Sequence, residues 1–306
     1  MKRPITILFF FLMSYQYVSA QDKANISSST IDTIQFKYNK VNNIIIEAIL
    51  NQRDTISIMF HTAIGSVSLT PEMTSLLISK EKKSSNSISW TGSKEVNYTE
   101  NNSLKLPNQF YDNLTVWVDM LSGPETDGKF GPNLFEGKII EVDNDFQFIA
   151  LHEPETFHLD NNNFQKFKLL PNENNSLIIE GEIMVNNQII KNKFLIHSGY
   201  GGTIILDDRF FKSNSILHDL KIIEENDLKD SHGNVIKTKK INIDSFKFGN
   251  LVFNNLPISY FDSKLEIQKT SVIGCEILRR GNFYFDIRNS ELYISKNNQT
   301  TESFKI

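Results

Sequence analysis

The chain has 306 residues, of which 40% are hydrophobic, and a formal net charge of −4 with acidic and basic residues mixed along it. This length is enough for one large domain or two of ordinary size, and the apolar content is enough for a sizeable core. Because the chain has no long basic block, we expect no nucleic-acid partner. The single cysteine excludes an internal disulfide and a thiolate zinc cluster.

Residues 1–20 have the pattern of a secretory signal peptide. A positively charged start is followed by an apolar stretch at 5–13 and by small residues at 18–20, ahead of a cleavage point before Gln21. The apolar stretch is too short for a membrane span, and no later stretch is long enough. We therefore expect a soluble protein that is exported to the periplasm or the extracellular space.

The rest of the sequence has the pattern of a mainly β protein. Most apolar runs are short, rich in Ile, Val, Phe and Thr, and separated by Asn, Asp, Ser and Gly. Short helices are expected at 71–80, where a proline falls in the first turn, and at 207–214. Residues 81–87 and 160–163 are expected to be loops. Residues 298–306 are expected to form a frayed polar tail.

The sequence also repeats itself once, at long range. Three segments of the first half recur in the same order in the second half, which is hard to obtain by chance. We therefore expect two homologous β lobes, at residues 21–160 and 161–297, and a monomeric protein. The matched segments are 44–50 with 177–183, 56–73 with 192–210, and 128–143 with 271–286.

Two histidines and two glycines fall at equivalent points of this repeat. His61 and His197 each follow an apolar, β-prone run and precede a turn with a small hydroxyl residue. Later in each half, an apolar-apolar-Gly segment ends at Gly131 or Gly274. The two histidines are therefore the first candidates for a functional site.

These features resemble the pepsin-like and retropepsin-like aspartic proteases, in particular the bacterial secreted members with both lobes in one chain. The resemblance spans nearly all of the sequence after the signal peptide. It implies a mainly β fold of two β-barrel-like lobes, with a few short helices and a cleft between the lobes. The segments that carry it are "IMFHTAIGSVSLT", "DGKFGPNLF" and "KIIEVD" in the first lobe and "FLIHSGYGGTIILDD", "SVIGCEIL" and "FYFDIRNSELYIS" in the second.

The sequence departs from that family at the catalytic positions. In the family each lobe supplies one aspartate, and the two carboxylates share a proton so that one activates a water molecule. Here the matching positions are His61 and His197, and Ala63 replaces the turn glycine of the first lobe. Because imidazole is larger than carboxylate, the replacement predicts that the two turns are pushed apart.

The flanking residues keep the family's pattern. The resemblance assigns to Thr62 and Ser198 the hydroxyls that bond across the two turns and hold the pair in place. It assigns to Gly199 the glycine that lets the backbone turn, and to Gly131 and Gly274 the glycines of the later segments. These five residues are therefore expected to be supporting residues.

Two neutral imidazoles can hold a water molecule near neutral pH, but they cannot reproduce the shared proton of two carboxylates. The first hypothesis is therefore a degenerate dyad and a pseudo-protease that binds an extended peptide or a protein partner. The alternative is an active endopeptidase that uses His61 and His197, with or without a metal. A third hypothesis, an envelope scaffold with no ligand, predicts an occluded cleft.

In the family, a hairpin folds over the cleft and grips an extended peptide by strand addition. Residues 88–104 are the candidate for that hairpin, and Trp90 and Tyr98 are the aromatic residues expected to face the cleft. A core position is an equally good interpretation of both rings.

No cofactor is expected, although zinc bound to His61 and His197 is a less favoured alternative that needs a third ligand. The six histidines show no HxxxH or HxH spacing. Of the other histidines, His152 and His158 lie near the end of the first lobe, and His218 and His232 lie in loops or strand ends of the second. All except His232 are interpreted as solvated or core-edge side chains.

The remaining candidates are interpreted as structural. Asp143 and Asp286 are expected to cap turns after the last core strand of each lobe. Asp127 and Asp230 are expected to serve in turns, since Asp and Gly-Asn suit hairpin geometry. Cys275 is expected to be a small buried apolar residue.

Overall fold

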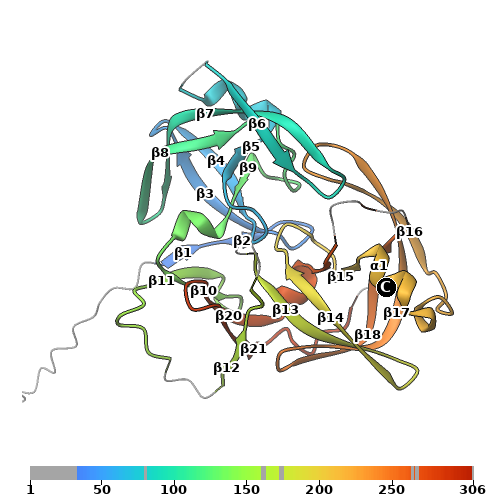
Figure 1. The fold of residues 1–306 in the computed structure, drawn as a ribbon. Helices are drawn as coiled ribbons and strands as arrows, with labels where there is room; N and C mark the ends of the chain where they lie inside the picture. The colour runs from blue at the N-terminus through green and yellow to red at the C-terminus, as the bar shows by residue number, and fades with distance from the viewer. Residues whose placement is uncertain are drawn as a thin grey trace, which may run out of the picture. The chain divides into compact units, whose positions relative to one another are not determined.

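A computed structural model describes residues 33–78, 81–159, 163–171, 176–262, 265 and 269–304, and they form the mainly β fold that was predicted (Figure 1). The expected signal peptide and residues 160–162, at the expected lobe boundary, lie outside the described residues. Three sheets of eight, seven and six strands make up the fold. Within the described ranges, no helix is long and apolar enough to cross a membrane.

Six strands of the eight-stranded sheet close into a ring, because β3 pairs with β7 as well as with β4. Strand β3 carries the first repeated segment, and all of its apolar residues except the half-buried Ile49 are buried. Strands β2 and β6 remain at the edges. In sheet order, the strands are β2 (Lys37–Tyr38), β3 (Ile44–Leu50), β4 (Asp54–Phe60), β9 (Gly128–Phe130), β5 (Val67–Leu69), β8 (Gln109–Trp117), β7 (Ser93–Leu106) and β6 (Lys83–Ile88).

The seven-stranded sheet closes in the same way, through an additional pairing of β13 with β17. Its ring has the same order of strands and the same parallel pairings as the first ring. The sequence repeat is therefore a repeat of structure. In sheet order, the strands are β13 (Ile178–Val185), β14 (Gln188–Ile196), β19 (Ser271–Ile273), β15 (Ile204–Leu206), β18 (Leu251–Phe261), β17 (Val235–Phe248) and β16 (Glu224–Lys229).

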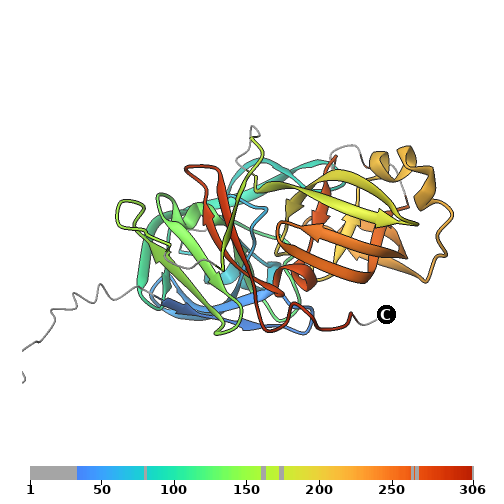
Figure 2. The ribbon, with the colours of Figure 1, turned by 90° about the horizontal axis from the view of Figure 1, so that it is seen from below.

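The six-stranded sheet joins the two halves of the chain. Its centre is the antiparallel pairing of β10 with β20, in which Val142 lies opposite Phe283. Figure 2 shows the red hairpin of β20 and β21 beside the green strands β10 and β11. In sheet order, the strands are β1 (Thr33–Gln35), β11 (Phe148–His152), β10 (Ile139–Asp143), β20 (Gly281–Asp286), β21 (Glu291–Lys296) and β12 (Gln165–Lys168).

The helices are short, and one expected loop is a strand. The helix expected at 71–80 is a 3-10 turn, η1 (Pro71–Leu76), and the helix expected at 207–214 is α1 (Asp208–Ser213), capped by the side chain of Asp207. The prediction of a loop at 81–87 is wrong: β6 pairs with β7, but its polar residues are exposed on both faces and show no alternation. The remaining short helices are η2 (Pro132–Phe135), η3 (Ser215–Leu217) and α2 (Cys275–Leu278).

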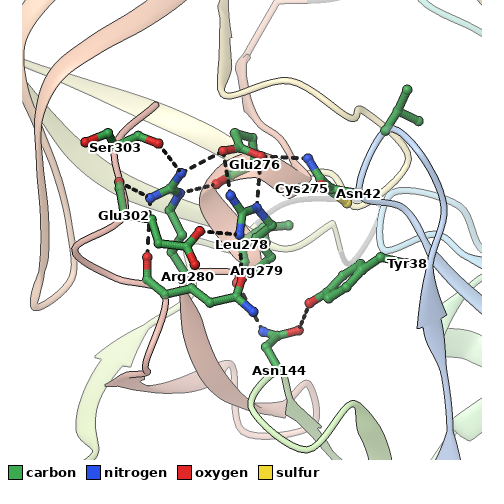
Figure 3. Close-up of polar contacts among 12 residues, drawn as sticks. Tyr38, Asn42, Asn144, Cys275, Glu276, Leu278, Arg279, Arg280, Glu302 and Ser303 are labelled. Carbon is green, nitrogen blue, oxygen red and sulfur yellow. Dashed lines mark hydrogen bonds and ion pairs between the residues drawn. The ribbon is translucent and has the colours of Figure 1, made fainter. Parts of the chain in front are cut away.

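The described part of the C-terminal tail is anchored rather than frayed (Figure 3). The side chain of Arg280 is fully buried, and its guanidinium donates to the backbone carbonyls of Glu302 and Ser303. The ring of Phe304 lies 4.0 Å from the same guanidinium. These contacts hold residues 298–304 against α2 and the strand that follows it.

Candidate functional site

The two histidines lie side by side at the ends of equivalent strands. His61 follows β4 and His197 follows β14, and each backbone N–H donates to a carbonyl of the neighbouring parallel strand, at Phe130 and Ile273, over 2.9 Å. The ring centroids are 4.5 Å apart, and the ring planes are inclined by 56°. Both residues are buried, with 6% and 7% of their surface exposed. The fold thus brings residues that are 136 positions apart into one pair.

Four reciprocal hydrogen bonds lock the two turns together. The N–H of Thr62 donates to Ser198 Oγ, and the N–H of Ser198 donates to Thr62 Oγ1, each over 2.9 Å. Thr62 Oγ1 then donates to the carbonyl of Ile196, and Ser198 Oγ donates to that of Phe60, each over 2.7 Å. The expectation that the imidazoles push the turns apart is therefore wrong, because both sets of bonds are intact.

Glycine makes room for the imidazole of His61. A Cβ atom at Gly199 would collide with that ring, so only glycine leaves space for it there. Gly131 and Gly274 have a different role: a Cβ at either position would collide with a backbone carbonyl, at Ile64 and at Gly202. Both glycines therefore permit the close approach of the later segment to the turn.

Both histidines are neutral at pH 7. Burial, the neighbouring His197 and the charge of Lys129 hold the pKa of His61 well below its usual value. Burial, and more weakly Lys129, lower the pKa of His197 to about 4. His61 Nδ1 accepts a hydrogen bond from the N–H of Ala63 (3.2 Å), so the proton of the neutral ring is on Nε2. His197 Nδ1 is buried and has no hydrogen-bond partner among the described residues.

A buried lysine, which sequence analysis did not identify, belongs to the same site. Lys129 lies on β9, is 3% exposed, and donates from Nζ to the carbonyl of Leu121 (2.7 Å) and to Ser231 Oγ (2.6 Å). Burial lowers its pKa to about 8, although Asp230 acts in the opposite direction. The equivalent residue of the second ring is Val272. A lysine at a position where the other half of the repeat has an apolar residue was therefore the signal in the sequence that could have identified Lys129.

The hairpin of β6 and β7 places Trp90 against the histidines. The indole contacts the ring of His197 with centroids 5.4 Å apart and that of Phe261 with centroids 5.6 Å apart. Tyr98, on the same hairpin, packs instead against Trp117 and is not among the residues that line the cavity described below. Of the two aromatic residues expected to face the cleft, only Trp90 therefore has that position.

The tip of this hairpin is bonded to the second ring by Asp230. Its carboxylate accepts from Ser89 Oγ (2.7 Å) and Thr91 Oγ1 (2.6 Å). It also accepts the backbone N–H groups of His232 and Asn234, which is the turn role expected from the sequence. Burial alone would raise the pKa of Asp230, but the hydrogen bonds from Thr91, Ser89 and Asn234 together lower it to about 2. Asp230 is therefore ionised at pH 7.

A cavity of about 1270 Å³ adjoins the histidine pair. Both rings of strands contribute to its lining, so it corresponds to the cleft predicted from the sequence. Its lining includes His61, Trp90, Lys129, His197, Tyr200 and Asp230.

Comparisons of the sequence with protein-family models and with curated proteins find no match. Among solved structures, the crystal structure of the aspartic proteinase from Irpex lacteus matches with a TM-score of 0.52 and 10% sequence identity, over 89% of this chain and 98% of that chain. The fold is that of a pepsin-like aspartic proteinase. The two-lobed β architecture predicted from the repeat is confirmed by this match.

Within this proteinase fold, an asparagine and the cysteine support the turn of the second lobe. Asn43 Nδ2 (2.9 Å) and Cys275 Sγ (2.8 Å) both donate to the carbonyl of Ser198. Burial raises the pKa of the Cys275 thiol to about 12, so it is no nucleophile at neutral pH. Figure 3 shows the neighbouring Asn42 donating to Glu276 over 2.6 Å, a second link from the first half of the chain to α2.

The other histidines and aspartates singled out in the sequence have local partners or lie apart from the pair. His152 bonds to Glu141 (2.7 Å), and His218 bonds to the carbonyl of Phe211 (2.9 Å). His158 is exposed. In the part of the chain that the structure describes, no group of three or more His, Cys, Asp or Glu side chains is placed to hold a metal ion. The three remaining aspartates accept backbone N–H groups: Asp143 from Phe146, Asp286 from Asn289, and Asp127 from Ser57.

Proposed function

We propose that this protein binds an extended peptide or protein segment in the cavity beside its histidine pair and does not cleave it by acid-protease chemistry. The observation that carries the proposal is the pair of buried, neutral imidazoles at two equivalent turns, which the resemblance in sequence matches to the catalytic aspartates of the family. Acid-protease chemistry needs one proton shared between two carboxylates, which His61 and His197 cannot supply.

The edge strands of both sheets support the binding of an extended segment. Among the strands of the described residues, β6 is an edge of one sheet and β16 is an edge of the other, so each has backbone groups that no described strand pairs with. The residues that follow them, Ser89 and Asp230, are bonded to each other and line the cavity. A segment that adds to such an edge forms backbone hydrogen bonds and places alternate side chains in the cavity. Binding of this kind needs no catalytic acid.

Export is part of the proposal, because it rests on the signal-peptide pattern of residues 1–20. The protein would then meet its ligand outside the cytoplasm.

A second candidate function is a peptide hydrolase that acts near neutral pH. It is favoured by one observation: His197 Nδ1 is buried beside the cavity without a partner among the described residues. A neutral imidazole can accept a proton from water as a general base. With a pKa of about 4 this base is weak, which is why binding is the first proposal.

The test is incubation of the protein, from Gln21 onward, with a diverse peptide mixture at roughly pH 3 to 8, with and without zinc. Mass spectrometry reads both the products and the peptides that the immobilised protein retains. We expect retained peptides and no products. The double variant His61→Ala/His197→Ala serves as the comparison, its folding checked by circular dichroism, and His158→Ala is the matched control. Cleavage that is lost in the double variant but kept in the control would overturn the proposal in favour of the hydrolase.

A further inference from the structure

Three basic side chains line the cavity beside the two turns. His61, His197 and Lys129 supply three nitrogen bases to its lining. Their hydrogen-bond partners in the described residues are neutral: backbone groups at Ala63 and Leu121, and the hydroxyl of Ser231. A buried ammonium group in neutral surroundings is costly unless an anion compensates it.

The carboxylates that line the same cavity are already engaged. Asp230 accepts the hydroxyls of the hairpin tip and two backbone N–H groups. Glu276 is held by Arg279 and Arg280. Glu302 pairs with Arg279 over 3.0 Å. Of these acids, Asp230 alone is close enough to raise the pKa of Lys129, and its oxygens are taken by the hairpin tip.

The buried side chain of His197 also points to a ligand in this cavity. His197 is more than nine-tenths buried, lines the cavity, and has no hydrogen-bond partner for Nδ1 in the described residues. Buried polar atoms in folded proteins almost always have a partner, which is often water or a ligand. Because Nδ1 of His61 accepts a bond, its Nε2–H is also a donor.

We propose that the cavity recognises a carboxylate, placed against Lys129 and the imidazoles of His61 and His197. This inference rests on the proposed function and adds the chemical class of the ligand: a peptide that presents either an acidic side chain or its own C-terminal carboxylate. An ammonium group and imidazole N–H donors are the partners that a carboxylate needs in a site shielded from water.

The proposal has a consequence for protonation. The titratable groups that act on the two histidines are Lys129 and, for His61, the other ring of the pair. A bound carboxylate favours the protonated imidazole and therefore raises the pKa of each ring. Binding of the anion is thus accompanied by uptake of protons at mildly acidic pH.

The first experiment compares three pools of N-acetylated hexapeptides on the immobilised protein at pH 7. One pool has a central glutamate and an amidated C-terminus, one has a central glutamine and an amidated C-terminus, and one has a central glutamine and a free C-terminus. We expect one carboxylate-bearing pool to be retained at least about tenfold more than the neutral pool, which corresponds to about 1.4 kcal/mol. The pool that is enriched identifies the source of the carboxylate.

Lysine variants test the residue that carries the charge. Lys129→Met is expected to abolish the preference, Lys129→Arg to retain part of it, and Lys193→Met, at an exposed lysine on β14, to leave it unchanged. Equal retention of all three pools would overturn the inference and leave the proposed peptide binding intact. Retention of no pool by the folded protein would overturn both.

An NMR titration of the unmodified protein tests the same inference without any variant. The probes are acetate and its neutral analogue acetamide, and the signal is the ring carbon-bound proton of His197. We expect acetate to raise the pKa of His197 by about one pH unit and acetamide to leave it unchanged. The same response to both probes, or to neither, would contradict a carboxylate site.

Discussion

The turn that carries His61 and the turn that carries His197 share one backbone arrangement but have different surroundings. Each has the same strand before it, the same bond to the neighbouring parallel strand and the same half of the cross-turn bonding. Around His61, the N–H of Ala63 satisfies Nδ1. Around His197, Nδ1 has no partner in the described residues, and Trp90 covers the ring.

The two turns therefore share their hydrogen-bonded backbone and differ in the side chains around it. Backbone hydrogen bonds and the hydroxyls of Thr62 and Ser198 are the same in both halves, and they determine where the side chains lie. The chemistry depends on positions that differ between the halves. The most important is Lys129, whose equivalent in the second half is Val272. Four changes can test this comparison, from the largest expected effect to the smallest.

Removal of one cross-turn hydroxyl should have the largest effect. Ser198→Ala deletes one bond to the N–H of Thr62 and one to the carbonyl of Phe60, and it leaves both groups buried without these partners. We expect a loss of roughly 4 kcal/mol in the free energy of unfolding, measured by urea denaturation. Ser213→Ala, at an exposed serine of α1, is the control. A loss below about 0.5 kcal/mol would mean that the hydrogen bonds between the two turns contribute little to stability.

The stability of the protein should fall between about pH 6.5 and pH 4. In this window the unfolded chain binds protons at histidines that the folded protein keeps neutral, so the free energy of unfolding decreases as the pH falls. With a folded pKa of about 4, His197 alone accounts for about 3 kcal/mol, and His61 acts in the same direction.

Urea denaturation across this pH range measures the slope. His197→Gln should flatten it, whereas His158→Ala, which removes an exposed histidine, should not. An unchanged slope in the His197 variant would show that this ring is not kept neutral by the fold.

A double-mutant cycle of Gly199 and His61 should show why the second turn needs glycine at a position where the first turn has Ala63. Gly199→Ala places a methyl group against the ring of His61 and should cost about 2 kcal/mol, because overpacking forces the ring or the turn to move. In a His61→Ala background the same substitution should cost almost nothing. If the cost persists in that background, the backbone rather than the ring is what requires glycine.

The smallest effect is expected at the hairpin tip. Asp230→Asn replaces the carboxylate that accepts hydrogen bonds from Ser89 and Thr91 with a neutral amide. We expect amide hydrogen exchange at 89–92 to become roughly fivefold faster, which corresponds to a loss of about 1 kcal/mol of local stability. Asp227→Asn, on the edge strand that precedes Asp230, is the control. In the unmodified protein, the protection of these amides should fall only as the pH drops from about 4, where an aspartate in the opened tip takes up a proton, toward about 2, the pKa of Asp230 in the closed tip. Unchanged exchange at 89–92 in the Asp230 variant would show that Asp230 does not hold the tip.

The sequence predicted the ring architecture and the meeting of His61 with His197, because duplicated apolar segments specify duplicated strands. It did not predict β6, because its polar residues are largely exposed and do not alternate with apolar residues, so they carry no strand pattern. It also did not show that Tyr98 faces Trp117. The register shifts within β7, between Thr99 and Leu104, show that alternation along this strand is not regular.

Lys129 was missed for a different reason. Lys129 lies between Gly128 and Phe130 and so has the local appearance of an exposed turn residue. Its burial results from contacts with distant residues. Ser231, which accepts its hydrogen bond, lies 102 positions later in the chain. The same holds for Asp230: its turn role is local and was predicted, but its bonds to Ser89 and Thr91 depend on how the two rings meet.

The six-stranded sheet has a consequence for biosynthesis. Strand β10 finds its partner β20 only after almost the whole chain has been made, since Ile140 pairs with Phe285. Until then the first half exposes an apolar strand edge, which is the kind of surface that aggregates or recruits chaperones. This sheet therefore cannot close until the last strands have emerged.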